Sequence, residues 1–118
     1  MLGKIERLFM KILLVVPMRS FTGEVIKDGE ADLMLRSVLL SALSRGGDQN
    51  ATYTEKSLQF SLGVKIASAG DEVELISDEI KMLKDITAKI FSSLIVGQVG
   101  KLLEGQLTGI SPQPEVKE

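Results

Sequence analysis

The chain of 118 residues contains no histidine, no cysteine and no tryptophan. The lack of histidine and cysteine removes the commonest general base, the commonest metal ligand and the strongest protein nucleophile. A chain without cysteine also forms no disulfide, which fits a reducing compartment. We therefore expect a protein that is not an enzyme, takes no small-molecule substrate and holds no metal or cofactor.

Aromatic residues are also few, at 4% of the chain, whereas 44% of the residues are hydrophobic. A chain of this length forms one domain and buries roughly two thirds of the surface that it exposes when unfolded. The core must then be built from leucine, isoleucine, valine and methionine. The formal net charge of −2 is too balanced for the basic surface that binds nucleic acid, so nucleic acid is not an expected partner.

The first residues are basic and apolar. We assign residues 1–9 to a leader that is disordered or binds a partner. The apolar run is interrupted by Lys11 and is too short for a signal peptide or a membrane span. We therefore expect no membrane span. Because a second methionine, Met10, opens the next segment, either Met1 or Met10 is the native start.

The remaining chain divides into a body and a tail. Residues 10–105 carry the periodic apolar patterns and are assigned to a single globular domain. Residues 106–118 contain two prolines and no such pattern, so they are assigned to a flexible tail.

Turn signals near the N-terminus predict a hairpin. The spacing up to residue 16 is helical, but β-branched residues in Lys11–Met18 favour a strand, so we expect helix or disorder first and strand after it. Glycine-containing turns follow at residues 21–24 and 28–29. We predict that Ile12–Pro17 pairs with Glu24–Lys27.

Helical spacing predicts helices over about residues 33–44, 78–90 and 94–104. Asp32 is the expected N-cap of the first and Ser77 of the second. The predicted fold class is α+β, mainly α, with an N-terminal β-hairpin followed by about four short helices. The residues predicted to face the core of these three helices are Leu35, Val38, Leu39, Ala42, Ile80, Leu83, Ile86, Thr87, Ile90, Ile95, Val99, Leu102 and Leu103.

Residues 57–66 fit either a helix or a strand. Apolar and polar residues alternate along them, which favours a strand. The same segment has apolar residues four apart and Thr54 as an N-cap, which favours a helix, although Gly63 costs a helix about 1 kcal/mol. The alternating residues are Leu58, Phe60, Leu62, Val64 and Ile66.

From Asp28 onward the order of features resembles a family of small proteins encoded by phages and prophages. The resemblance covers about residues 21–104, implies a helix over residues 54–69 and carries no activity. It departs at Gly63, where an alanine-like residue would suit a helix better. It implies a location in the host cytoplasm or in the virion. The residues that carry it are Asp28–Gly29, Leu35–Leu43, Glu55–Lys56, Lys65–Ile66, Asp71–Leu75, Asp78–Ile80, Lys84 and Leu94–Leu103, with Val96–Gly97–Gln98–Val99 as the most specific piece.

Two segments contain residues that metal or catalytic sites use, but neither segment predicts such a site. Residues 48–52 begin like an EF-hand loop, but Tyr53 and Gln59 stand where glycine and a bidentate glutamate are needed. The carboxylates of residues 71–79 have no electrophilic partner nearby and are typical of a helix start and a strand edge. These carboxylates are Asp71, Glu72, Glu74, Asp78 and Glu79.

We expect the chain to be a non-enzymatic phage accessory or structural protein that acts through protein–protein contacts, as a homo-oligomer or with another phage protein. The alternative is a small DNA-binding regulator of winged-helix or helix-turn-helix type, with residues 54–69 and 78–90 as two of its helices. The acids of residues 71–79 argue against that alternative, because they would face phosphates. The predicted contact residues are Leu2, Ile5, Leu8 and Phe9 in the leader and Val96, Val99 and Gly100 in the last helix.

Overall fold

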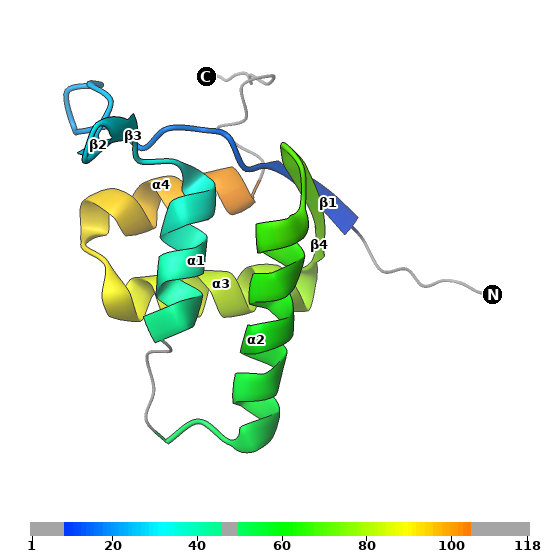
Figure 1. The fold of residues 1–118 in the computed structure, drawn as a ribbon. Helices are drawn as coiled ribbons and strands as arrows, with labels where there is room; N and C mark the ends of the chain where they lie inside the picture. The colour runs from blue at the N-terminus through cyan, green and yellow to red at the C-terminus, as the bar shows by residue number, and fades with distance from the viewer. Residues whose placement is uncertain (1–8, 46–49, 105–118) are drawn as a thin grey trace, which may run out of the picture.

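A computed structural model of the chain describes residues 9–45 and 50–104. These residues form four helices and two small antiparallel sheets, so the α+β, mainly α, fold class is confirmed (Figure 1). The helices are α1 (Leu35–Arg45), α2 (Tyr53–Ser68), α3 (Ser77–Ile90) and α4 (Ser93–Leu103). The strands are β1 (Phe9–Leu13), β2 (Lys27–Asp28), β3 (Ala31–Asp32) and β4 (Glu72–Ile76).

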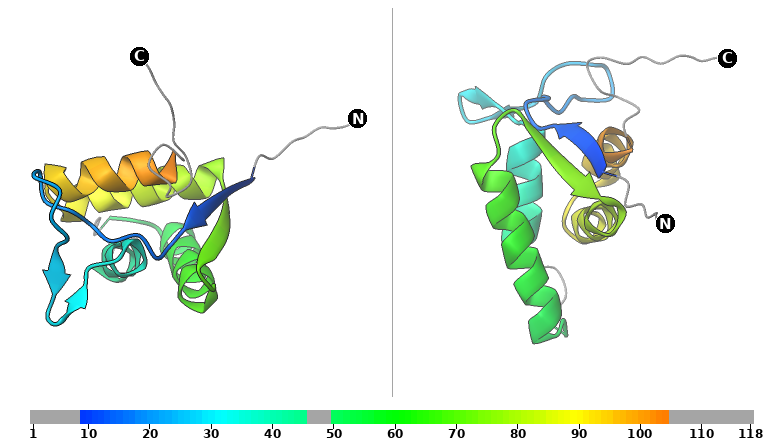
Figure 2. Two further views of the ribbon diagram at one scale, coloured as in Figure 1. Left: turned by 90° about the horizontal axis from the view of Figure 1, so that it is seen from above. Right: turned by 90° about the vertical axis from the view of Figure 1, so that its right-hand side faces the viewer.

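The helices lie in two layers that cross each other. One layer holds α1 beside α2, and the other holds α3 beside α4 (Figures 1 and 2). The β1–β4 sheet borders the second layer, since β4 leads directly into α3 and β1 contacts α4. The N-terminal half of α2 projects away from the α3–α4 layer (Figure 2). One side of α2 is therefore left without a neighbouring helix among the described residues.

The core is aliphatic, as the shortage of aromatic residues predicts. All the residues predicted to face it from α1, α3 and α4 are buried, except that Ile90 is partly buried. The helical periodicity of these three segments therefore located their buried faces correctly. The β1–β4 sheet and the segment that follows β1 add further buried side chains from outside the helices, which are Ile12, Leu14, Met18, Val73 and Leu75.

Strand β1 pairs with β4, not with Glu24–Lys27 as the sequence predicts. Ile12 lies opposite Val73 in this ladder, and both side chains are buried. The pairing of β1 with β4 puts their buried residues on one face of the sheet, against the helices. The strand also begins at Phe9, inside the segment assigned to the leader. The predicted pairing was wrong because a distant strand offers the better apolar complement.

The predicted N-terminal hairpin is partly present at other residues. Arg19 forms an isolated bridge with Val25, and the two-residue strands β2 and β3 pair around Gly29. Gly29 has φ of 71°, a conformation that glycine adopts without steric cost, so the turn forms at the predicted Asp28–Gly29.

Residues 57–66 are helical, so the alternating pattern misled and the helical alternative is confirmed. The N-cap is Thr52 rather than Thr54. The Thr52 hydroxyl accepts a hydrogen bond from the Glu55 N–H (3.1 Å), and the Glu55 carboxylate accepts one from the Thr52 N–H (2.9 Å). This capping box fixes the start of α2 and is readable in the sequence as Thr-x-x-Glu.

The starts of α1 and α3 also differ from the predicted caps. Asp32 belongs to β3, where it accepts a hydrogen bond from Lys27 Nζ (2.6 Å), and α1 begins only at Leu35. Ser77 is the first residue of α3, and Ile76 is its N-cap. Asp32 does not cap α1 because it belongs to β3, and Ser77 does not cap α3 because the helix begins one residue earlier than predicted, directly after β4.

Candidate protein-binding surface

Helix α2 has a second apolar side that the chain does not cover. Only Leu62 and Ile66 of α2 are buried. Tyr53, Phe60 and Val64 are 86%, 74% and 51% exposed. On a helix, residues at these positions and Ala67 share one side, because they recur every three or four residues. We call Tyr53, Ser57, Phe60, Val64 and Ala67 the outer stripe of α2.

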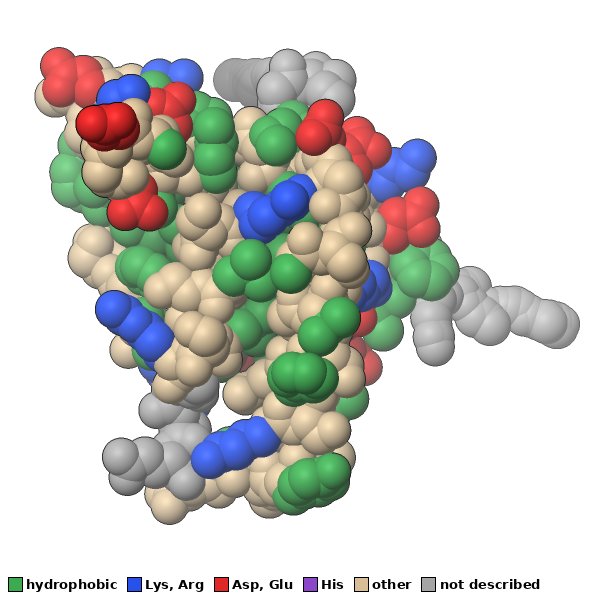
Figure 3. All heavy atoms as spheres, in the orientation of Figure 1, with side chains coloured by type: hydrophobic (Ala, Val, Ile, Leu, Met, Phe, Trp, Pro, Cys, Tyr) green, Lys and Arg blue, Asp and Glu red, His purple; other side chains and the backbone are tan. Residues whose placement is uncertain are grey.

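The outer stripe borders a groove between α1 and α2 of about 600 Å³. From α1 the groove receives Leu40, which is half-buried, and Leu43, which is nearly buried. Gly63 forms its floor on α2, and a Cβ there would lie 3.9 Å from Leu43 Cδ1. Hydrophobic side chains along this part of α2 and beside it are visible in Figure 3. The groove is lined by Leu40, Leu43, Ser44, Arg45, Lys56, Gln59, Phe60, Gly63, Val64 and Ala67.

The rim of this groove is basic. Arg45, at the end of α1, and Lys56, in the first half of α2, are both exposed and line it. The Arg45 guanidinium also lies 5.9 Å from the centre of the Phe91 ring, a cation–π contact. The groove therefore combines an apolar floor with two cations at its edge. This arrangement suits a macromolecular segment with apolar side chains better than a small polar molecule.

The predicted contact residues do not come together in one place. Leu2, Ile5 and Leu8 lie outside the described residues. Phe9 begins β1 and is 59% exposed. In α4, Val96 and Gly100 are half-buried, whereas Val99 is buried in the core and is not available for contact. The outer stripe of α2 was missed, although two of its residues, Phe60 and Val64, belong to the alternating pattern noted in the sequence.

The glycines of α4 are not required by close packing within the described chain. A Cβ at Gly97 or at Gly100 would meet no atom within 4 Å. Within the described residues, a side chain at either position would therefore not clash with a neighbouring helix.

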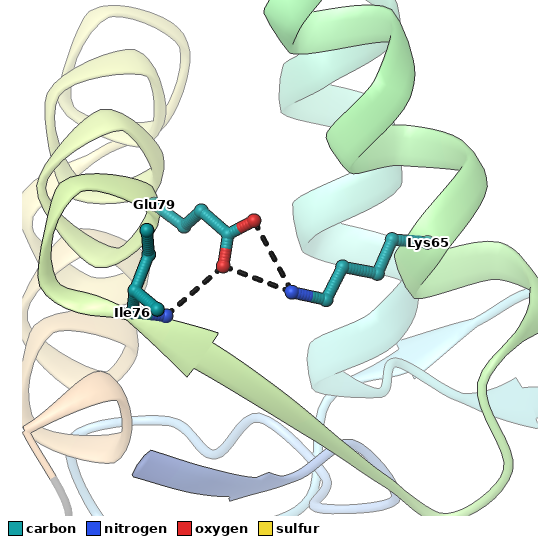
Figure 4. A network of polar contacts seen from close by, with 3 residues as sticks. All are labelled: Lys65, Ile76 and Glu79. Carbon is teal, nitrogen blue, oxygen red and sulfur yellow. Dashed lines mark hydrogen bonds and ion pairs between the residues drawn. The ribbon is translucent and has the colours of Figure 1, made fainter. Parts of the chain in front are cut away.

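Glu79 is the one residue of the acidic segment with a clear structural role. Its Oε1 accepts hydrogen bonds from the Ile76 N–H (3.0 Å) and from Lys65 Nζ (3.0 Å), and its Oε2 lies 3.2 Å from the same nitrogen (Figure 4). The carboxylate satisfies an N–H at the start of α3 and joins α3 to α2 by an ion pair. Glu72, Glu74 and Asp78 are exposed.

Removing the Glu79 carboxylate is expected to cost more than removing its exposed neighbours. Glu79→Ala should lower the free energy of unfolding by about 2 kcal/mol, because it loses both the cap and the ion pair. Glu79→Gln keeps an acceptor for the Ile76 N–H and should cost about 1 kcal/mol. Urea denaturation measures both, with Glu74→Ala as the control at about 0.5 kcal/mol or less. Equal losses for Glu79→Ala and Glu74→Ala would contradict this role.

Other kinds of site find no support in the described part of the chain. No group of three or more aspartate or glutamate residues lies close enough there to hold a metal ion. Among the same residues, no helix has the length and apolar character that crossing a membrane requires. A second hollow, of about 350 Å³ between α2 and α3, is edged by charges of both signs, including the Lys81–Asp85 pair.

Comparisons of the chain with protein-family models, with curated proteins and with solved structures found no match.

Proposed function

We propose that the chain is a non-enzymatic phage accessory or structural protein that acts through protein–protein contacts, in the host cytoplasm or in the virion. The observation that carries the contact role is the outer stripe of α2 with the adjoining groove. Two aromatic rings stand 86% and 74% exposed on one helix beside an apolar groove. A contiguous apolar area of this kind on a small domain marks an interaction site more often than chance exposure. The phage assignment rests on the resemblance of residues 21–104.

The DNA-binding alternative receives less support from the same surface. A helix that reads or approaches DNA carries cations toward the phosphates. Lys56 lies at the edge of the groove, but the projecting side of α2 carries aromatic and aliphatic residues, and Lys65 is already paired with Glu79. We therefore expect no salt-dependent binding to random duplex DNA at low ionic strength.

Site-specific photo-crosslinking tests the contact role. A photoreactive phenylalanine analogue replaces Phe60, and in a matched control it replaces Phe21, which is 85% exposed in a turn away from α2. After irradiation of infected host cells, the position-60 chain should form a discrete protein adduct and the position-21 chain should not. A position-60 chain that forms no adduct would overturn the proposed function.

A further inference from the structure

We propose that the outer stripe of α2 is a dimer interface, in which α2 packs antiparallel against α2 of a second copy around Phe60. This inference rests on the proposed function, because it names the partner that covers the surface. Three features of the described chain support it, which are the spacing of the stripe, the area that it exposes and the placement of its charge.

The spacing of the stripe is that of a helix–helix seam. Its residues follow one another at intervals of four, three, four and three, from Tyr53 to Ala67. A seam with this repeat stays on one side of a helix over several turns and packs against a second helix. The five residues span nearly the whole of α2, and Phe60 is the middle one. A two-fold axis through Phe60 therefore brings the Tyr53 end of the stripe against the Ala67 end of the second copy.

Antiparallel pairing matches large residues with small ones. With Phe60 at the axis, Tyr53 lies opposite Ala67 of the second copy, and Ser57 lies beside Val64 of the second copy. Parallel pairing would instead set tyrosine against tyrosine and leave a gap at Ala67. Close packing favours the complementary arrangement, since a gap forfeits contact energy.

The charge at the edge of the stripe is compatible with this orientation. In the antiparallel pair the two Lys56 side chains lie along the same edge of the seam, about 12 Å apart along the helix axis. The lysine stem can then cover the edge of the facing α2 while its ammonium stays in water. Each α2 also places its N-terminus beside the C-terminal end of the other, which aligns the helix dipoles favourably.

The exposed area is sufficient for a reversible dimer. At 86% and 74% exposure, the rings of Tyr53 and Phe60 together present about 300 Å² on each copy. Two copies then contribute about 600 Å² from these rings alone, and Val64, Ala67 and Leu40 bring the total close to the 1,000 Å² or so that a specific interface needs. The projection of α2 from the body leaves room for the second copy (Figure 2). We expect a reversible association in the micromolar range.

Sedimentation of the full chain across the micromolar range tests the dimer. The wild-type chain should form a reversible dimer, and Phe60→Glu should weaken the association about 30-fold or more, because a buried aromatic anchor becomes a charge at the axis. Phe21→Glu is the matched control and should associate like the wild type. Circular dichroism should show unchanged folding for both variants, since both rings are exposed.

Cysteine crosslinking tests the orientation, because the chain has no cysteine of its own. A mixture of Ser57→Cys and Val64→Cys chains should form mixed disulfide dimers faster than either chain alone. Faster self-crosslinking of Ser57→Cys would overturn the antiparallel arrangement. A wild-type chain that stays monomeric, or a Phe60→Glu chain that dimerises as well as the wild type, would overturn the dimer itself. In that case, photo-crosslinking from position 60 to a different protein would still support the proposed function.

Discussion

Replacing Leu14 by alanine is expected to lower the free energy of unfolding by about 3 kcal/mol, because the substitution opens a cavity at a fully buried side chain. Leu14 lies where three elements meet. Its N–H donates to the Asp71 carbonyl (2.7 Å) just before β4, and its own carbonyl accepts from the Arg36 N–H (3.2 Å) in α1. The side chain and the peptide therefore hold β1, β4 and α1 together.

The neighbouring residue supplies the control for Leu14. Val15 follows it in the chain but is 44% exposed, so Val15→Ala should cost about 0.5 kcal/mol or less. Urea denaturation of both variants measures the difference. If the two variants lost the same stability, residues 9–14 would not be an integral part of the domain, and the β1–β4 pairing would be contradicted.

Replacing Gln98 by leucine is expected to lower the free energy of unfolding by about 2 kcal/mol. The Gln98 Oε1 accepts from the Arg19 N–H (2.8 Å), and its Nε2 donates to the Arg19 carbonyl (2.7 Å) and to the Leu94 carbonyl (3.0 Å). The backbone N–H and the backbone carbonyl of Arg19 thus both bond to one side chain, and leucine satisfies neither. The amide of Arg19 should also exchange with deuterium many times faster in the variant.

Two further variants test whether the loss of stability comes from the Gln98–Arg19 hydrogen bonds or from any substitution in α4. Gln98→Glu keeps the acceptor for the Arg19 N–H but loses the donor, so its stability should lie between those of the leucine variant and the wild type. Lys101→Leu changes an exposed residue of the same helix and should cost about 0.5 kcal/mol or less. Unchanged deuterium exchange at Arg19 in Gln98→Leu would show that the side chain does not hold this segment.

The role of Gln98 explains the most specific piece of the sequence resemblance in structural terms. Val96–Gly97–Gln98–Val99 lies in α4, where Val99 enters the core and Gln98 fastens the segment around Arg19 to the helix. The piece maintains the fold and does not form the exposed apolar surface. We therefore place the contact site on α2 rather than on α4.

The sequence predicts the local features of the fold well. The buried faces of α1, α3 and α4 follow from a spacing that repeats every three or four residues, and the turn at Asp28–Gly29 follows from its glycine. The partner of β1 could not be predicted in the same way. Nothing in the spacing of Phe9–Leu13 distinguishes β4, some sixty residues away, from the nearer Glu24–Lys27.

The alternating pattern of residues 57–66, which favours a strand, also explains why the candidate surface was not predicted. Apolar residues that alternate along a strand share one face. On a helix, residues two apart differ in direction by about 200°, so the same residues are spread around the helix. Leu62 and Ile66 consequently reach the core, while Phe60 and Val64 point outward. The Thr52–Glu55 capping box identifies the helix, and the helix then implies an apolar side without a partner.

The solvent exposure of Phe60 in the cell is the most direct test of the claim that the outer stripe of α2 binds protein. Hydroxyl-radical oxidation compares Phe60 with Phe21, two chemically identical rings that are 74% and 85% exposed in the isolated chain. In dilute purified protein the two rings should be oxidised at similar rates. In the cells that naturally produce the chain, Phe60 should be oxidised several-fold more slowly than Phe21, because protein covers the outer stripe of α2. Equal oxidation of the two rings in the cell would contradict the claim that α2 is a protein-binding surface.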